Sequence, residues 1–79
     1  MAKRTLTAKQ IMEEINRRLA DSLDMDCREC RILIPRPARG EDYGGNWRVG
    51  DMEDCTRGCI VELGRIVGEV RNQYDCSDW

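Results

Sequence analysis

The chain lacks histidine and phenylalanine entirely, and aromatic residues make up only 5% of its 79 positions. Histidine is the side chain that most often transfers protons near neutral pH, and it is the commonest metal ligand. Its absence excludes Ser–His and Cys–His nucleophile pairs and restricts any zinc site to thiolates. Acidic neighbours such as Glu13 and Glu14 fall in regions without a predicted cleft. We therefore assign no catalytic residue and expect no enzyme.

Long apolar runs are also missing. Charged side chains, among them Lys3, Arg4, Glu13 and Arg17, interrupt the first twenty residues, which excludes the apolar core of a signal peptide. No later run is long enough to span a bilayer. We therefore expect a cytoplasmic protein that has no membrane partner.

The charge balance and the length set further limits. Thirteen Lys and Arg against 15 Asp and Glu give a net charge of −2, which is not the strongly basic balance of a dedicated nucleic-acid-binding protein. A chain of this length buries only about 60% of the surface that its unfolded form exposes. We predict one small domain over residues 1–79, with flexible ends at about 1–5 and 75–79.

The first half of the chain contains a well-marked helix. Thr7 and Gln10 have the spacing of a capping box, and Leu6 with Ile11 fits a hydrophobic staple across the same helix start. Apolar residues then recur at three- and four-residue spacing, at Ala8, Ile11, Met12, Ile15 and Leu19. The pattern predicts an amphipathic helix from about residue 8 to residue 22.

Two short strands are predicted in the middle of the chain. Residues 30–34 are rich in β-branched side chains, and residues 47–49 carry a similar pattern. Pro35 and Pro37 have no N–H to donate, so the first strand ends at a sheet edge or leaves the sheet. The intervening segment is too short for a crossover connection, which predicts an antiparallel hairpin.

A second amphipathic helix is predicted after the hairpin, with Asp51 as its N-cap. Its apolar positions are Met52, Cys55, Cys59, Ile60, Leu63, Ile66, Val67, Val70 and Tyr74. The fold class is thus α+β, in the order helix–strand–strand–helix, with both helices packed on one face of the hairpin. A homodimer that joins two hairpins edge to edge would make a four-stranded sheet and enlarge a small core.

Five cysteines are the unusual feature of the composition. Cys27 and Cys30 form a Cys-x-x-Cys pair before the first strand, and Cys55 and Cys59 form an i, i+4 pair in the predicted second helix. Because the first strand of a hairpin starts beside the end of the second strand, the two pairs are expected to converge. Four thiolates there could close a tetrahedral zinc site, and the layout resembles the treble-clef zinc arrangement of knuckle, hairpin and helix.

Two other interpretations of these cysteines stay open. Cys55 and Cys59 fall within the apolar stripe, so the cysteines could be buried thiols, in which case we expect no cofactor. Cys27 and Cys30 could also be a redox dithiol, although a thioredoxin-like pair follows a strand rather than precedes one. An odd cysteine count without a secretion signal argues against a disulfide framework, and Cys76 is expected to be an exposed tail residue.

Three glycines, Gly58, Gly64 and Gly68, lie inside the predicted second helix, where each costs up to about 1 kcal/mol relative to alanine. Gly64 and Gly68 share a helix face with Val61, away from the apolar stripe. We predict that another element packs on this face, most simply the same helix of a second copy of the chain. The first helix could fill that role instead, and the glycines could also be exposed without a packing role.

Arginines gather around the predicted hairpin, at Arg31, Arg36, Arg39 and Arg48. Arginine binds phosphate well, so this patch could contact nucleic acid or another anionic partner. The alternative is a solvated face whose arginines pair with nearby acids such as Asp51. With a net charge of −2, we do not favour nucleic acid.

Taken together, these patterns predict an interaction or structural module whose partner is a protein, most simply itself. The alternative is a module stabilised by zinc on four cysteines that binds nucleic acid or protein through the hairpin arginines. A Cys-x-x-Cys dithiol redox protein is the third hypothesis.

Overall fold

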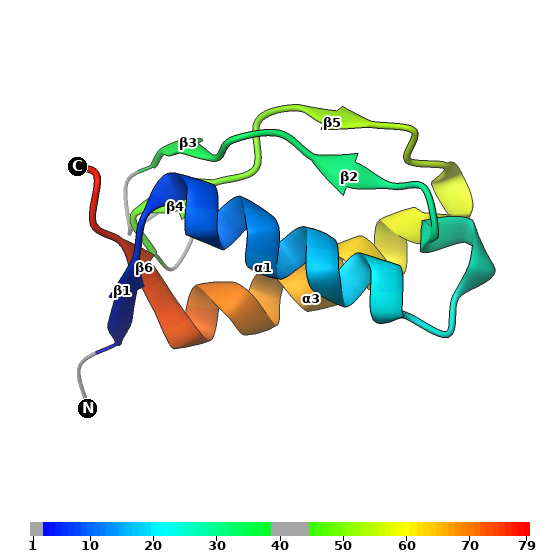
Figure 1. The fold of residues 1–79 in the computed structure, drawn as a ribbon, viewed down its shortest axis with the longest axis horizontal. Helices are drawn as coiled ribbons and strands as arrows, with labels where there is room; N and C mark the ends of the chain where they lie inside the picture. Colours follow the sequence, from blue (N-terminus) through cyan, green and yellow to red (C-terminus); the bar gives the residue numbers. More distant parts are fainter. Residues whose placement is uncertain (1–2, 39–44) are drawn as a thin grey trace.

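The computed structural model describes residues 3–38 and 45–79. The elements, in chain order, are β1 (Arg4–Leu6), α1 (Ala8–Asp21), the 3-10 turn η1 (Met25–Cys27), β2 (Arg31–Ile32), β3 (Arg36–Pro37), β4 (Trp47–Arg48), β5 (Met52–Glu53), the 3-10 turn η2 (Arg57–Cys59), α3 (Ile60–Gln73) and β6 (Tyr74–Cys76). The predicted α+β class is therefore confirmed, with two helices and short antiparallel strand pairs in the part of the chain that the structure describes. In Figure 1 the helices lie side by side and run in opposite directions, and the strands β2 to β5 follow one side of the pair.

The start of α1 is fixed by the predicted capping box. The Thr7 hydroxyl accepts a hydrogen bond from the backbone N–H of Gln10 at 3.1 Å, and the Gln10 side chain accepts one from the N–H of Thr7 at 2.9 Å. These bonds satisfy two donors that a helix start leaves without partners. The helix then buries Ala8, Ile11, Ile15 and Leu19 against the core, as the spacing predicted.

The central strands form one irregular hairpin. Arg31 pairs with Glu53 in the β2–β5 ladder, and Pro37 pairs with Trp47 in the β3–β4 ladder, in a single continuous register. Both pairs are antiparallel, as expected. The segment that connects the two predicted strands, expected as a turn or loop over residues 39–46, lies outside the described residues from 39 to 44.

The predicted start of the second helix is wrong. Met52 continues the hairpin opposite Ile32, and the carbonyl of Asp51 accepts a hydrogen bond from the N–H of Leu33 instead of capping a helix. Asp54 then adopts a positive φ of 55°, which ends the strand. The helix α3 begins only at Ile60, after η2, so the apolar spacing of Met52 and Cys55 matched the helical period by coincidence.

The two ends of the chain meet in a parallel strand pair at one end of the helices (Figure 1). Leu6 pairs with Cys76, and the N–H of Ser77 donates to the carbonyl of Leu6 at 2.8 Å. Beyond β6, the carboxylate of Asp78 accepts from the N–H of Ala8 at 2.9 Å and so contributes to the cap of α1. Three-residue strands are too short to show an alternating pattern, which is why sequence analysis missed this pairing and treated both ends as flexible.

The core lies between the two helices and the hairpin, and Trp47 is its largest fully buried side chain. The indole N–H of Trp47 donates to the carbonyl of Tyr74 at 3.0 Å, and the guanidinium of Arg71 lies 5.4 Å from the ring centroid. The other core side chains come from α1, α3, β2 and the cysteines: Ala8, Ile11, Ile15, Leu19, Cys27, Cys30, Ile32, Cys59, Leu63, Ile66, Val67, Val70 and Cys76.

Two asparagine side chains form hydrogen bonds to the backbone of a strand, where a neighbouring strand would otherwise bond. Asn16 accepts from the N–H of Ile32 at 2.8 Å and donates to its carbonyl at 3.1 Å, so α1 covers the outer edge of β2 at this residue. Asn46 makes the same two bonds to the backbone of Cys76, each at 2.8 Å. Covering an edge in this way blocks pairing with another strand. The predicted edge-to-edge joining of two hairpins would therefore have to use the other edge.

Replacing Asn16 with alanine is expected to lower the free energy of unfolding by about 1–3 kcal/mol, because it leaves the backbone N–H and C=O of Ile32 without partners. Urea denaturation followed by circular dichroism measures this change. Lys9→Ala, at an exposed position on the same helix, is the matched control and should have little effect. Equal unfolding midpoints for the two variants would contradict the assigned role of Asn16.

Candidate functional site

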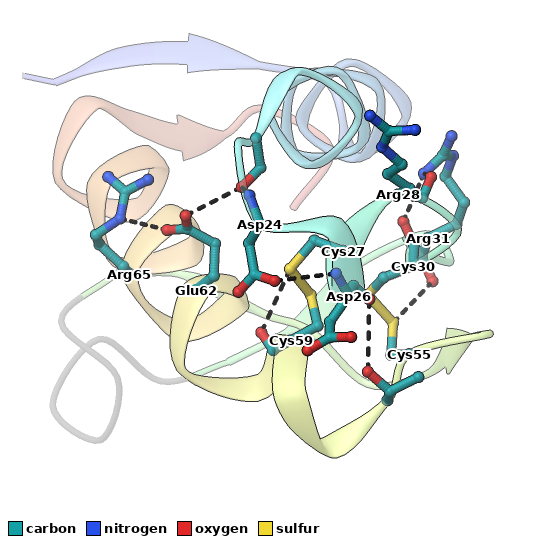
Figure 2. Close-up of a disulfide and its surroundings, with 12 residues drawn as sticks. Asp24, Asp26, Cys27, Arg28, Cys30, Arg31, Cys55, Cys59, Glu62 and Arg65 are labelled. Atoms are coloured by element: carbon teal, nitrogen blue, oxygen red, sulfur yellow. Dashed lines mark hydrogen bonds and ion pairs between the residues drawn. A yellow bond between two sulfur atoms is a disulfide. The ribbon is translucent and has the colours of Figure 1, made fainter.

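The four cysteines of the two predicted pairs meet at one end of the molecule and form two disulfides (Figure 2). Cys27, at the end of η1, is bonded to Cys59, at the end of η2, with their Cα atoms 5.0 Å apart. Cys30, just before β2, is bonded to Cys55, just after β5, with a Cα–Cα distance of 4.2 Å. The hairpin register causes this convergence, because Arg31 pairs with Glu53 immediately beside the Cys30–Cys55 bond.

This geometry confirms the predicted convergence but corrects the argument against disulfides. The odd cysteine count is explained by four bonded cysteines plus the single free Cys76. A redox Cys-x-x-Cys in its oxidised form has a disulfide between its own two cysteines. Cys27 and Cys30 are not bonded to each other. Each is bonded to a member of the second pair. Disulfide sulfurs offer no thiolate, and the described residues contain no group of three or more side chains placed to hold a metal ion. Zinc binding by these cysteines stays a prediction.

The disulfides lie in a tightly packed junction. Cys27, Cys30 and Cys59 are fully buried, whereas Cys55 is only partly buried. A Cβ atom added to Gly58 would overlap the carboxylate of Asp26, so a larger residue here would require that side chain to move where η1 approaches η2. Gly58 thus belongs to η2 rather than to the second helix, where it was predicted.

Polar contacts shape the turn that carries Cys27 and Cys30. The carboxylate of Asp24 accepts from the N–H of Asp26 at 3.0 Å and caps η1. The guanidinium of Arg31 donates to the carbonyls of Arg28 and Cys30, at 3.1 and 2.7 Å, on the other side of the turn (Figure 2). A positive charge therefore lies against the segment that holds both cysteines.

The fifth cysteine was predicted to be exposed, and this prediction is wrong. Cys76 lies in β6 and is 3% exposed, because β6 pairs with β1 and the Asn46 amide covers its backbone. Burial raises the pKa of the Cys76 thiol above its ordinary value. A buried, protonated thiol reacts slowly with alkylating reagents.

A thiol count tests the cysteine assignment directly. In protein kept oxidised and free of metal by a chelator, one thiol per chain should react with a chromogenic thiol reagent after denaturation, and almost none before it. Cys76 supplies that single thiol. If five thiols react after denaturation, the cysteines are buried thiols and the disulfides are absent.

The second candidate site is the outer face of α3, which we define by Ile60, Val61, Gly64 and Gly68. Val61 is 84% exposed and lies on the side of the helix opposite Leu63 and Ile66, whereas Ile60, which is 50% exposed, lies between this side and the buried stripe. A Cβ atom added to Gly64 or to Gly68 would meet no heavy atom within 4 Å among the other described side chains and the elements around α3. The first helix therefore does not pack on this face, although sequence analysis left that alternative open.

One flank of the outer face carries charges that are already paired within the chain. Arg65 bonds to Glu62 at 2.5 Å and to Glu69 at 2.6 Å. The hydrogen bond from Arg65, followed by one from Ser22, lowers the pKa of the Glu62 carboxyl. Since these charges are neutralised locally, they do not call for a charged partner.

The predicted arginine patch is spread along the hairpin. Arg36 forms an ion pair with Asp51 at 2.7 Å and lies opposite Arg48 in the ladder, whereas Arg31 lies at the disulfide end. Arg39 lies outside the described residues. The structure thus pairs Arg36 with a nearby acid, as the alternative interpretation expected, and engages Arg31 with backbone carbonyls.

No family model, no curated protein and no solved structure matches the chain. Among the described residues, neither helix is long and apolar enough to cross a membrane.

Proposed function

We propose that this chain is a small protein-interaction module that self-associates through the outer face of α3. The observation that carries this proposal is the open space beside Gly64 and Gly68. Each glycine in a helix interior costs about 1 kcal/mol relative to alanine. At both positions a methyl group would fit without touching a neighbouring element. The glycines therefore give a single folded chain no packing contact that offsets their cost.

A second helix supplies the missing physical reason for these glycines. Residues four apart lie on the same side of a helix, and two glycines at this spacing leave a shallow groove where another backbone can approach closely. The exposed side chains beside this groove, Ile60 and Val61, are large and apolar. Burying apolar area of this kind is the main favourable term in protein association.

The partner that best fits this face is a second copy of the same helix. In an antiparallel pair related by a two-fold axis, Gly64 of one copy lies near Gly68 of the other, so the surface is complementary to itself. The four residues of the outer face carry no charge, and the flanking Arg65 is neutralised within its own chain. A chain of 79 residues also has little core of its own, which favours sharing apolar surface with a partner.

Alanine substitution at the two glycines separates this proposal from a purely structural explanation. We expect the double variant Gly64→Ala, Gly68→Ala to stabilise the isolated fold by about 0.5–1 kcal/mol per site, because alanine is the better helix former. The same variant should weaken the dimer by about tenfold or more, because added methyl groups in a close contact cost roughly 1–3 kcal/mol. Urea denaturation measures the first effect, and sedimentation velocity measures the second.

The matched control is Gln73→Ala, which changes an exposed residue of α3 away from the outer face. It should leave the dimer dissociation constant unchanged. If the double glycine variant assembles as tightly as wild type, α3 is not the contact surface.

Nucleic-acid binding through Arg31, Arg36, Arg39 and Arg48 is the less favoured alternative. Arg31 and Arg36 already have partners within the chain, so a phosphate would have to displace them. A gel shift with single-stranded RNA or DNA that weakens as salt rises would support this alternative. No shift at low salt would count against it.

A further inference from the structure

We propose that the two disulfides are the oxidised form of a metal site, in which the reduced thiolates of Cys27, Cys30, Cys55 and Cys59 bind one Zn²⁺. The proposal is independent of self-association through α3. It begins from the way the structure pairs these cysteines: each member of the first pair is bonded to a member of the second. The four cysteines therefore lie in one junction, formed by η1, η2 and the adjacent ends of β2 and β5 (Figure 2).

Metal binding requires the sulfurs of each bonded pair to move apart. Zn–S bonds of about 2.3 Å in a tetrahedral site place the sulfurs about 3.8 Å from one another. The sulfurs of a disulfide lie about 2.05 Å apart. Each bonded pair therefore has to open by about 1.7 Å, which requires the cysteine side chains to rotate and η1 to move away from η2.

The chemistry of the donor set selects the metal. The chain has no histidine, so the site offers only sulfur, and soft thiolate ligands favour zinc over calcium or magnesium. Four thiolates around Zn²⁺ carry a net charge of −2. Arg31, whose guanidinium lies against the carbonyls of Arg28 and Cys30, places a compensating positive charge at the turn. Asp24 and Asp26 of the same turn oppose this effect in part, although Asp24 is engaged in capping η1.

Reduction starts at the most accessible sulfur, which belongs to Cys55 because Cys27, Cys30 and Cys59 are fully buried. A low-molecular-weight thiol, as its thiolate, attacks the Cys55 sulfur. The S–S bond breaks, Cys30 leaves as a thiolate, and a mixed disulfide forms at Cys55. A second reductant thiol attacks this mixed disulfide, frees Cys55 and departs as the oxidised reductant.

The same two steps open the Cys27–Cys59 bond. In total, four reductant thiols become two reductant disulfides, and the protein gains four thiols. Binding of Zn²⁺ then releases four protons as the thiols become thiolates. The metal would replace the disulfides as the link between η1 and η2, so the junction keeps a staple in both redox states.

A cobalt titration of the whole chain tests the proposal. The protein is reduced, stripped of metal by a chelator and freed of both reagents without air, and Co²⁺ is then added. We expect one Co²⁺ per chain, the visible absorption of a tetrahedral thiolate complex, and displacement of Co²⁺ by Zn²⁺. Oxidised wild-type protein is the control. It should bind no Co²⁺, because its four cysteines are held in disulfides.

Two variants assign the ligands. Cys76→Ser removes the cysteine that lies away from the cluster and should keep one Co²⁺ with the same spectrum. Cys55→Ser should shift the spectrum and weaken binding, because one thiolate is lost. Reduced wild-type protein that gives only the spectrum of Co²⁺ in buffer overturns the proposal, whether that protein is folded or unfolded. An unchanged spectrum in Cys55→Ser overturns the ligand assignment.

Discussion

Reducing both disulfides in the presence of a chelator is expected to lower the free energy of unfolding by about 4–6 kcal/mol. The crosslinks close loops with sequence separations of 32 and 25 residues, and a loop of this length is worth roughly 3–4 kcal/mol. The Cys30–Cys55 loop lies inside the Cys27–Cys59 loop, so the two effects do not add in full. Small domains have total stabilities of about 5–15 kcal/mol. The reduced, metal-free chain should therefore lie close to its unfolding threshold.

Urea denaturation with and without reductant measures this effect. Cys76→Ser is the control, because it removes the free thiol while leaving both disulfides in place. Wild type and this variant should lose a similar amount of stability on reduction. An unchanged urea midpoint after complete reduction, verified by thiol counting, would show that the packing around η1 and η2 holds the junction without a covalent link.

Replacing Trp47 with alanine is expected to cost about 3–5 kcal/mol, because it empties the largest fully buried position in the core. The loss combines three contributions: the apolar burial of the ring, the indole hydrogen bond to the Tyr74 carbonyl, and the stacking of Arg71 on the ring. Trp47→Phe keeps most of the ring and should cost less, about 1–3 kcal/mol, chiefly through the unpaired carbonyl of Tyr74.

Trp79 is the matched control for this experiment. It is 44% exposed, and its indole N–H donates to the carbonyl of Asn46 at 2.5 Å. Trp79→Ala should therefore cost about 1 kcal/mol, the net value of a typical hydrogen bond. If Trp79→Ala destabilises the protein as much as Trp47→Ala does, the core is not centred on Trp47.

The helices show how much of the fold the sequence could predict. The α1 helix was predicted almost to the residue, because Thr7 and Gln10 mark its start and its apolar spacing is regular. The core positions of α3, such as Leu63, Ile66 and Val70, were also predicted correctly. The start of α3 was predicted wrongly. Met52 and Cys55 continue the helical spacing of apolar residues, although Met52 belongs to the hairpin and Cys55 to the segment that follows it.

Contacts between distant segments were harder to predict. Convergence of the four cysteines followed from hairpin geometry, but their pairing into disulfides depends on packing between η1 and η2 that no local pattern encodes. The β1–β6 pair was missed for the same reason, and with it the burial of Cys76. The glycine face of α3 was found because two glycines in one helix conflict with helix propensity, and a conflict of this kind is visible in the sequence alone.

The central claim is that α3 presents a face for self-association, and the mass of the wild-type protein in solution tests it most directly. Sedimentation velocity over a concentration series up to high micromolar should show a shift from monomer to dimer. A denaturing gel without reductant should show that the dimer is not covalent. A wild-type chain that stays monomeric throughout this series would contradict the proposed function.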